Sequence, residues 1–263
     1  MCTYLSIGEK ERIVTPMTQD EKWLLKEKYN GQQTASFFAD CDRLTSGEPL
    51  AYVIGHTPFH NSTIHLDSHP LIPRPETEFW TEHVIKKIAD QGKTLVRVLD
   101  LCAGSGCIGV AVLKELPQST VDFVEIDASH HPTIHKNIKE NDIAISRTQI
   151  FGGSLFENVA GTYDYILTNP PYIDAHLNRT EESVITHEPA LALWGGLHGM
   201  EVIQKILESS PQHLTEDGVL YIEHEPEQVE AIHSHSTKFF GEIETLVDQF
   251  GILRFTRLSR PLK

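Results

Sequence analysis

Between residues 96 and 235, short apolar stretches of strand length alternate with segments of helical periodicity. The expected strands cover residues 96–99, 121–124, 163–167 and 219–222, and the expected helices cover residues 107–116, 129–141, 200–207 and 227–235. Strands that alternate with helices are typical of a mostly parallel sheet with helices on both faces. This pattern constrains the fold more than any other feature of the chain, and it predicts an α/β architecture.

The C-terminal residues depart from this alternation. Residues 243–247 and 252–258 alternate between apolar and polar side chains around Phe250-Gly251, which predicts a closing antiparallel hairpin. A chain of 263 residues suits one or two domains and can bury a core of its own.

The N-terminal part predicts two helices. Residues 1–17 are expected to be a tail. Thr18 and Glu21 form a capping box at the start of a helix that Gly31 ends, and residues 34–44 predict a second helix. Two short helices cannot hold a core alone, so we expect them to dock on another surface.

A hairpin is expected to link these helices to the α/β region. Residues 52–54 and 63–66 predict its strands, and Pro75 is expected in the first turn of the following helix. The sequence thus predicts three parts: a short helical substrate-docking module over residues 1–47, a β-hairpin linker over residues 48–72 and the main domain over residues 73–263.

Composition excludes several classes of protein. Lys and Arg number 22 against 37 Asp and Glu, a net charge of −15, which argues against direct binding of nucleic acid because such binding needs a basic surface. The apolar runs are too short to span a bilayer, and no secretory segment is recognisable. We therefore expect a cytoplasmic protein with no membrane partner.

The cysteines and histidines predict no metal site. The four cysteines have no CxxC spacing, so the sequence indicates neither a disulfide framework nor zinc. His131 and His135 lie one helical turn apart and His233 and His235 are close, but no third ligand is spaced to join either pair.

A glycine-rich loop joins the first expected strand of the α/β region to its helix. The strand ends on Asp100, and Gly104 and Gly106 allow close approach of the backbone to a ligand. Glu125 closes the next strand, roughly 20 residues on, where an acidic side chain accepts hydrogen bonds from ribose hydroxyls. Asp127 is the alternative for this role.

The ligand of this loop is expected to be S-adenosylmethionine rather than a dinucleotide. The loop lacks regular GxGxxG spacing and has no Walker lysine. Asp100 would repel a phosphate but could hold a cationic amino group. A ribose-binding acid together with an ammonium-binding Asp fits the sulfonium cofactor.

Asn169-Pro170-Pro171-Tyr172 follows the strand expected over residues 163–167. The prolines leave carbonyl groups free at the end of a strand, where open α/β sheets bind ligands. The Asn169 carboxamide oxygen and the Pro170 carbonyl offer two acceptors for one substrate NH₂ group, and Tyr172 offers a flat wall. Acceptors placed in this way would orient a poor amide or aromatic amine nucleophile toward a methyl donor.

Taken together, these motifs resemble the HemK family of protein-glutamine N5-methyltransferases, which methylate the Gly-Gly-Gln glutamine of peptide-chain release factors. The resemblance covers the chain from about residue 48 onward. Beside the glycine loop and Asn169–Tyr172, the segments that carry it are Glu-Pro-Leu-Ala-Tyr-Val-Ile-Gly (48–55), Leu-Ile-Pro-Arg-Pro-Glu-Thr-Glu (71–78) and His-Glu-Pro-Ala-Leu-Ala-Leu (187–193) before Gly195-Gly196.

The resemblance implies a class I methyltransferase, a Rossmann-like sheet of seven strands in the order 3-2-1-4-5-7-6. It implies catalysis by Asn169, Pro170 and Tyr172, with Pro171 completing the substrate clamp. The cofactor residues, from the resemblance and the loop argument together, are Asp100, Cys102, Ala103, Gly104, Ser105, Gly106, Glu125, Leu155 and Asn169. Leu155 would lie near the adenine of the cofactor and Thr77 near its methionyl end. The substrate would be a release factor, and the enzyme would act as a monomer.

Several positions depart from the family pattern. Cys102 replaces the usual first glycine of the loop, Ser154 replaces an Asp expected to contact the adenine amino group, and the helical region is short. Glu223-His224-Glu225 replaces the commoner Glu-Ile-Gly, for which the sequence offers no reason. The alternatives left open are a ribosomal-protein glutamine as substrate, an adenine-N6 methyltransferase of nucleic acid that uses the same clamp, and a non-catalytic cofactor-binding module.

Overall fold

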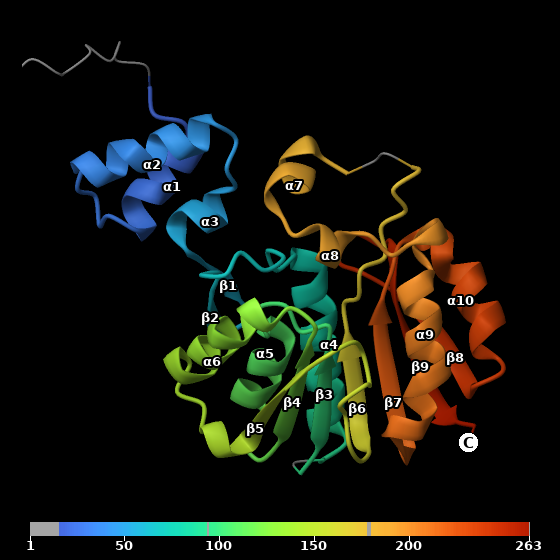
Figure 1. Cartoon of the computed structure of the whole chain (residues 1–263). Coiled ribbons are helices and arrows are strands. Elements are labelled where there is room, and N and C mark those ends of the chain that lie inside the picture. Colours follow the sequence, from blue (N-terminus) through green and yellow to red (C-terminus); the bar gives the residue numbers. More distant parts are fainter. Residues whose placement is uncertain (1–15, 94, 178–179, 263) are drawn as a thin grey trace, which may run out of the picture. The chain divides into compact units, whose positions relative to one another are not determined.

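The computed structural model of the chain describes residues 16–93, 95–177 and 180–262. The chain divides into two compact units, Met1–Ile54 and Gly55–Lys263 (Figure 1). The tail expected over residues 1–17 lies almost wholly outside the described residues.

The N-terminal unit consists of helices α1 (Gln19–Glu27), α2 (Ala35–Thr45) and α3 (Leu50–Ile54). The predicted capping box is present: the Thr18 hydroxyl accepts a hydrogen bond from Glu21 N at 3.2 Å, and the Glu21 carboxylate accepts one from Thr18 N at 2.7 Å. Buried side chains from all three helices form a small core, Leu24, Phe37, Cys41 and Val53. The two predicted helices are thus confirmed.

The prediction of a strand over residues 52–54 is wrong, because these residues belong to α3. The amide groups of Tyr52 and Val53 both donate to Pro49 O, and Val53 packs in the core of the helical unit. A short apolar run cannot be assigned to strand or helix by periodicity alone. The first strand of the hairpin lies further along the chain, where β1 (His56–Phe59) pairs antiparallel with β2 (Ser62–His65).

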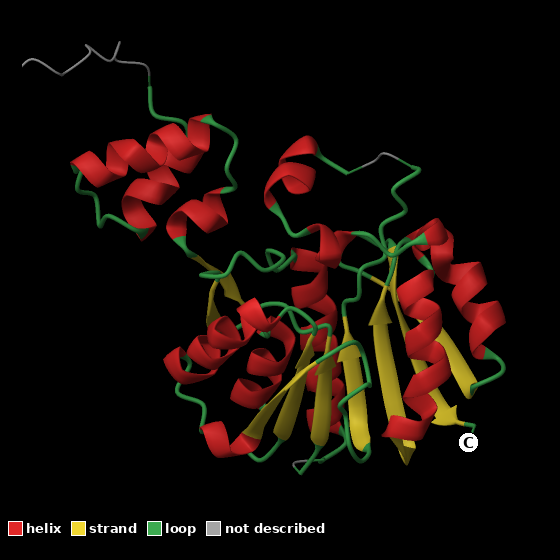
Figure 2. Ribbon diagram, viewed as in Figure 1, coloured by secondary structure: helices red, strands yellow, loops and turns green. Residues whose placement is uncertain are grey.

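The larger unit contains a sheet of seven strands (Figure 2). Its members are β3 (Arg97–Leu101), β4 (Thr120–Glu125), β5 (Thr148–Gly152), β6 (Tyr163–Thr168), β7 (Leu214–Glu223), β8 (Phe240–Val247) and β9 (Leu253–Pro261). They lie in the order β5-β4-β3-β6-β7-β9-β8, and only the pairs that include β9 are antiparallel. This is the predicted order and the predicted closing hairpin, so the fold class is confirmed. The residue pattern alone does not predict β5, because this edge strand is only partly buried.

The larger unit also has helices α4 (Pro75–Asp90), α5 (Cys107–Glu115), α6 (His131–Glu140), α7 (Glu182–His187), α8 (Ala190–Leu193), α9 (Glu201–Ser209) and α10 (Val229–Ser236). Short 3₁₀ turns cover Ala128–His130, Ile145–Arg147, Leu197–Gly199, Ser210–His213 and Pro226–Gln228. The chain runs outward from β3 on one side and from β6 on the other. Right-handed crossovers therefore place α5 and α6 on one face of the sheet and α9 on the opposite face.

Aliphatic side chains of the central strands fill the core between sheet and helices, among them Leu99, Ile166, Leu220 and Ile222, with Ile203 of α9 packed against them. Within residues 16–93, 95–177 and 180–262, no helix combines the length and apolar character needed to cross a membrane. Over the same ranges, no group of three or more potential metal ligands is found.

Candidate active site

The strand ends beside the β3–β6 pair bring the predicted site residues to one edge of the sheet. The chain leaves this pair in opposite directions, which creates the crevice where open α/β sheets bind ligands. Leu101 pairs with Thr168, and Thr168 pairs with Ile222. The residues that follow, Cys102, Asn169 and Glu223, therefore leave three neighbouring parallel strands at the same level.

The glycine-rich loop turns sharply at the end of β3. Cys102, Gly104 and Gly106 have φ angles of 61°, 54° and 77°, in the left-handed region that favours glycine. Ala103 N donates to Val124 O of the neighbouring strand at 2.9 Å, which anchors the loop on β4. Cys102 thus has a side chain at a position whose backbone conformation favours glycine. Burial raises the pKa of its thiol to about 12.

Glu125 lies at the end of β4, and the residue is 7% exposed. One oxygen accepts from Gly104 N and the other from Asp127 N, both at 2.8 Å. Each carboxylate oxygen has a second lone pair, so both retain the capacity to accept from a ligand. Asp127, the alternative ribose acid, lies beside the same cavity, but one of its oxygens accepts from Ser129 N at the start of a 3₁₀ turn.

Asp100 lies beneath the loop and is fully buried. One carboxylate oxygen accepts from Gly109 N at 2.8 Å, and the other has no hydrogen-bond partner among the described residues. Burial raises the pKa of this carboxyl to about 8. The structure does not bring Asp100 to the cavity wall, and its role toward a cationic amino group stays a prediction.

A cavity of about 170 Å³ opens above the loop. Seven of the predicted cofactor residues line it: Cys102, Ala103, Gly104, Ser105, Glu125, Leu155 and Asn169. Gly106, like Asp100, is not part of the lining; it forms the N-cap of α5. Ser154 and Thr77 line the same cavity, as does Lys205 of α9, which belongs to no motif that predicts a cofactor contact.

The Asn169–Tyr172 segment is held by side chains distant in sequence. Asn169 Nδ2 donates to Thr77 Oγ1 at 3.1 Å, and the Tyr172 hydroxyl donates to Glu223 Oε1 at 2.9 Å. Among the described residues, none donates to Asn169 Oδ1 or to Pro170 O. Both acceptors that the sequence assigned to the clamp are therefore free to bind a ligand.

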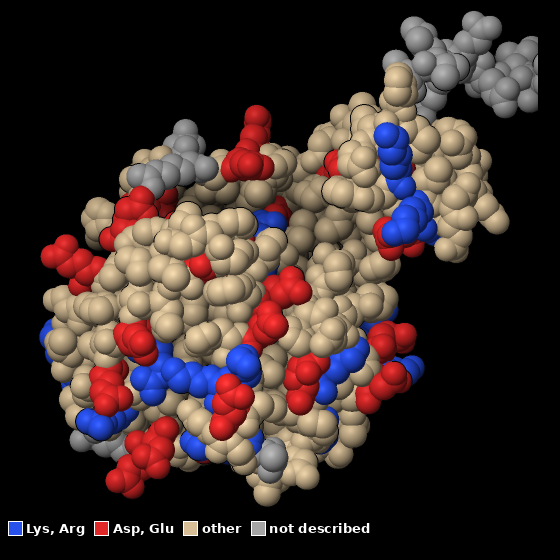
Figure 3. All heavy atoms as spheres, turned by 180° about the vertical axis from the view of Figure 1, so that it is seen from behind, with Lys and Arg blue, Asp and Glu red and all other residues tan. Residues whose placement is uncertain are grey.

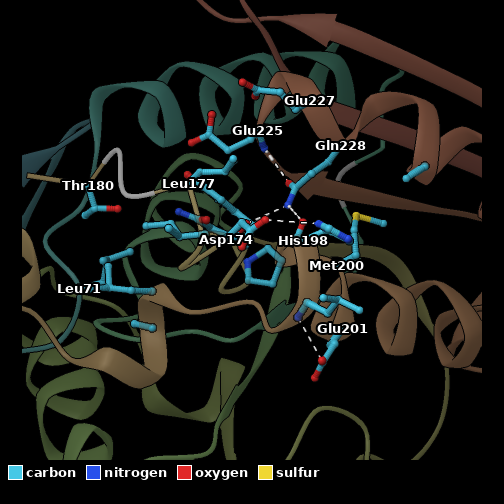
Figure 4. Close-up of a pocket in the computed structure, with 18 of the residues that line it drawn as sticks. Leu71, Asp174, Leu177, Thr180, His198, Met200, Glu201, Glu225, Glu227 and Gln228 are labelled. Carbon is cyan, nitrogen blue, oxygen red and sulfur yellow. Dashed lines mark hydrogen bonds and ion pairs between the residues drawn. The ribbon is translucent and has the colours of Figure 1, made fainter.

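A second cavity, of about 1050 Å³, is shown in Figure 4, and its lining shares Asn169 with that of the first cavity. Asn169, Pro170 and Tyr172 form part of its wall, whereas Pro171 faces the first cavity. The Gln228 side chain steadies this wall by donating to Tyr172 O at 2.8 Å and to His198 O at 3.1 Å. Three residues line both cavities, Leu71, Asn169 and Ala192.

The second cavity is rich in acidic side chains. Its lining includes Asp174, Glu181, Glu201, Glu225 and Glu227. Its described lining contains one Lys or Arg, the residue Arg74, and this guanidinium forms an ion pair with the buried carboxylate of Glu188. On the face that Figure 3 presents, Lys and Arg side chains are interleaved with Asp and Glu. An acid-lined cavity disfavours a phosphate backbone as its ligand.

The Arg74–Glu188 pair joins two of the segments that carry the family resemblance, residues 71–78 and 187–193. Glu188 also accepts a hydrogen bond from Ile72 N at 3.1 Å. These two hydrogen bonds join residues that are 114 and 116 positions apart in the sequence. They hold the Pro-Arg-Pro and His-Glu-Pro-Ala segments together beside both cavities. The resemblance did not assign a role to either charged residue.

Comparison with known proteins gives a consistent result. The model of the methyltransferase small domain family matches residues 77–192. A release factor glutamine methyltransferase of Bifidobacterium longum is 34% identical over 206 residues, which are 74% of this chain and 70% of the relative. A ribosomal protein uL3 glutamine methyltransferase of Bordetella pertussis is 34% identical over 193 residues, 72% of this chain.

The chain spans only 64% of the length of that uL3 relative, and 59% of a second one from Bradyrhizobium diazoefficiens. Among solved structures, the hMettl16 catalytic domain is similar with a TM-score of 0.60 at 15% identity, covering 75% of each chain. At this identity the likeness concerns the fold alone.

Proposed function

The chain belongs to the family of release factor glutamine methyltransferases, and we propose that it transfers a methyl group from S-adenosylmethionine to a protein glutamine. The observation that carries the proposal is the place of Asn169. This residue lies in the walls of both cavities, and its side-chain oxygen is unoccupied by any described protein donor. The first cavity would then hold the cofactor and the second the glutamine.

The first cavity has the chemical character that S-adenosylmethionine requires. Glu125 presents two acceptor oxygens suited to a pair of ribose hydroxyls. A Cβ atom built at Gly104 would meet nothing within 4 Å, so the loop leaves open space beside its backbone. Residues 102–105 would surround the methionyl part and Leu155 would lie near the adenine. When bound, the cofactor supplies an electrophilic methyl group on a sulfonium and leaves as S-adenosylhomocysteine.

The second cavity would position the nucleophile. The nitrogen of a glutamine carboxamide is weakly nucleophilic because its lone pair is delocalised into the carbonyl group. Asn169 Oδ1 and Pro170 O would each accept one N–H of this group, which orients the nitrogen toward the cofactor side. The same oxygens would stabilise the positive charge that develops on nitrogen as the new N–C bond forms.

No strong base is needed before the attack. The nitrogen becomes acidic once it carries the additional methyl group, and it then releases a proton. Tyr172 is an unsuitable base because burial raises the pKa of its hydroxyl and because this hydroxyl already donates to Glu223. The chain's contribution is therefore to bind and orient the substrate.

We assign the glutamine of the Gly-Gly-Gln motif of a release factor as the substrate. The relatives named as release factor enzymes, and the resemblance of residues 71–78 and 187–193, support this choice. Ribosomal protein uL3 is the second candidate, because two relatives with 32% and 34% identity carry that name. The helices before residue 48 would help to dock the protein substrate.

The test is incubation with methyl-labelled S-adenosylmethionine and one of four acceptors: a release factor, the same factor with its Gly-Gly-Gln glutamine replaced by alanine, uL3, and DNA. Label is expected on the intact release factor and not on the substituted one. Label on DNA would contradict the proposal. Label on uL3 alone would retain glutamine methylation and change the substrate.

A further inference from the structure

Glu223 is a buried carboxylate at the carboxyl end of β7, with 1% of its surface exposed. Its position follows from the register of the sheet. Thr168 pairs with Ile222, so Asn169 and Glu223 are the next residues on two adjacent parallel strands. The carboxylate lines neither cavity, and the function proposed above gives it no role.

Three donors from two other parts of the chain converge on this carboxylate. Thr77 Oγ1 and Trp80 Nε1, three residues apart on α4, donate to Glu223 Oε2 at 2.7 and 2.6 Å. The Tyr172 hydroxyl donates to Oε1 at 2.9 Å. Burial raises the pKa of the Glu223 carboxyl above its usual value, and the hydrogen bonds from these three donors offset part of that rise. A buried carboxylate that accepts hydrogen bonds from three donors is held in one position and orientation.

The hydrogen bonds define the direction of a relay from Glu223 to Asn169. An indole N–H can only donate, so Trp80 identifies Oε2 as an acceptor. Thr77 must then give its single hydroxyl proton to Oε2, and its oxygen is left to accept. The group that reaches this oxygen is the Asn169 NH₂, at 3.1 Å. The carboxamide of Asn169 is thereby turned with its oxygen away from Thr77.

We propose that Glu223 and Thr77 are positioning residues that fix the orientation of the Asn169 carboxamide, so that Oδ1 and not Nδ2 faces the substrate glutamine. The inference rests on the proposed function for the identity of that substrate. A reversed carboxamide would present N–H groups to the substrate NH₂, and two donors cannot form a hydrogen bond. The same carboxylate holds Tyr172, so both ends of the clamp share one anchor.

The decisive comparison is between two substitutions of Thr77. Thr77→Val keeps the shape of the side chain but removes the hydroxyl, whereas Thr77→Ser keeps the hydroxyl. We expect Thr77→Val to lower kcat by about 10–100-fold, the effect of one lost hydrogen bond at a reacting group, and to raise the Kd of S-adenosylmethionine by a smaller factor because Thr77 also lines the cofactor cavity. Thr77→Ser is expected to stay within about threefold of the wild-type kcat. Equal activity of the two variants would overturn the proposal.

Glu223→Gln removes the negative charge at this position but is expected to keep the orientation of the Asn169 carboxamide. Because the Trp80 N–H requires an acceptor, the new amide oxygen is expected to face Trp80 and Thr77, and the new NH₂ to face the Tyr172 hydroxyl, which can accept. The relay to Asn169 then keeps its direction. We expect Glu223→Gln to retain more activity than Thr77→Val, and a Glu223→Gln variant less active than Thr77→Val would contradict the relay.

A measurement without substrate distinguishes this inference from the proposed function. In protein labelled with ¹⁵N-asparagine, the side-chain amide signal of Asn169 is assigned by its loss in Asn169→Ala. Its protons are expected to exchange slowly in the wild type and in Thr77→Ser, and at least about tenfold faster in Thr77→Val. Equal exchange in all three proteins refutes the relay. Absence of methyl transfer by the wild type to every glutamine acceptor refutes only the function.

Discussion

The two cavities that meet at Asn169 differ in what forms their walls. On the side of β3 and β4, the loop at residues 102–106 presents main chain, and Glu125 is held by two backbone N–H groups. On the side of β6 and β7, side chains that are distant in sequence form the wall and are joined by hydrogen bonds through Glu223 and Gln228. The comparison indicates that the first side needs particular backbone angles, and the second needs particular pairs of side chains.

The largest effect is expected from Asn169→Ala. This substitution removes one of the two acceptors proposed for the substrate NH₂ but leaves the glycine loop and Glu125 in place. We expect kcat to fall by about 10²–10³-fold, as for the loss of one group that stabilises developing charge. The Kd of S-adenosylmethionine, measured by calorimetry, should change by only a few fold. Near-normal turnover would show that the clamp is not where the methyl group is transferred.

Glu125→Ala is expected to act on the first cavity and to weaken the binding of the cofactor. Loss of hydrogen bonds to a charged group costs about 1.5–3 kcal/mol, so the Kd of S-adenosylmethionine should rise by roughly 10–100-fold. Asp127→Ala is the matched control, with a smaller rise expected because the Asp127 carboxylate already caps a 3₁₀ turn. If the control has the larger effect, the ribose role belongs to Asp127.

Gly109→Ala tests how closely α5 must pack against β4 on the side of the first cavity. A Cβ atom at Gly109 would lie 2.3 Å from the Phe123 ring, so α5 would have to move away from β4. We expect a loss of about 1–3 kcal/mol in the free energy of unfolding, which exceeds the gain of about 1 kcal/mol in helix propensity. Denaturant unfolding measures this change. Unchanged stability would mean that the ring moves aside freely.

Cys102→Gly is expected to give the smallest effect and the opposite sign. The left-handed backbone at Cys102 costs a side-chain-bearing residue about 1–2 kcal/mol, part of which glycine loses again through its greater freedom in the unfolded chain. A net gain of about 0.5–1 kcal/mol in the free energy of unfolding is expected. A loss of stability would show that contacts of the thiol outweigh the backbone strain.

The same difference explains what could be predicted from the sequence. The alternation of strands and helices, the glycine loop and the capping box at Thr18 are local patterns, and the structure confirms the elements that they predict. Residues 52–54 were assigned to the wrong element because a short apolar run fits both a strand and a helix.

The acceptor side could be predicted only in part. Asn169–Tyr172 is a local motif, but the bond from Thr77 to Glu223 joins residues 146 positions apart, and that from Asn169 to Thr77 spans 92. No local pattern encodes such pairs. The Glu223-His224-Glu225 segment departs from the family pattern in the sequence, but the partners of Glu223 follow only from the register of β6 and β7.

The two cavities share three lining residues, Leu71, Asn169 and Ala192. This shared wall affects how the ligands of the two cavities can react with each other. The function proposed above requires the methyl group to pass from the first cavity to the second beside these shared residues. A bulkier side chain at Ala192 would add volume to the wall that both cavities share. A variant of this kind would lose methyl transfer while still binding both of its ligands if the added volume holds them too far apart to react.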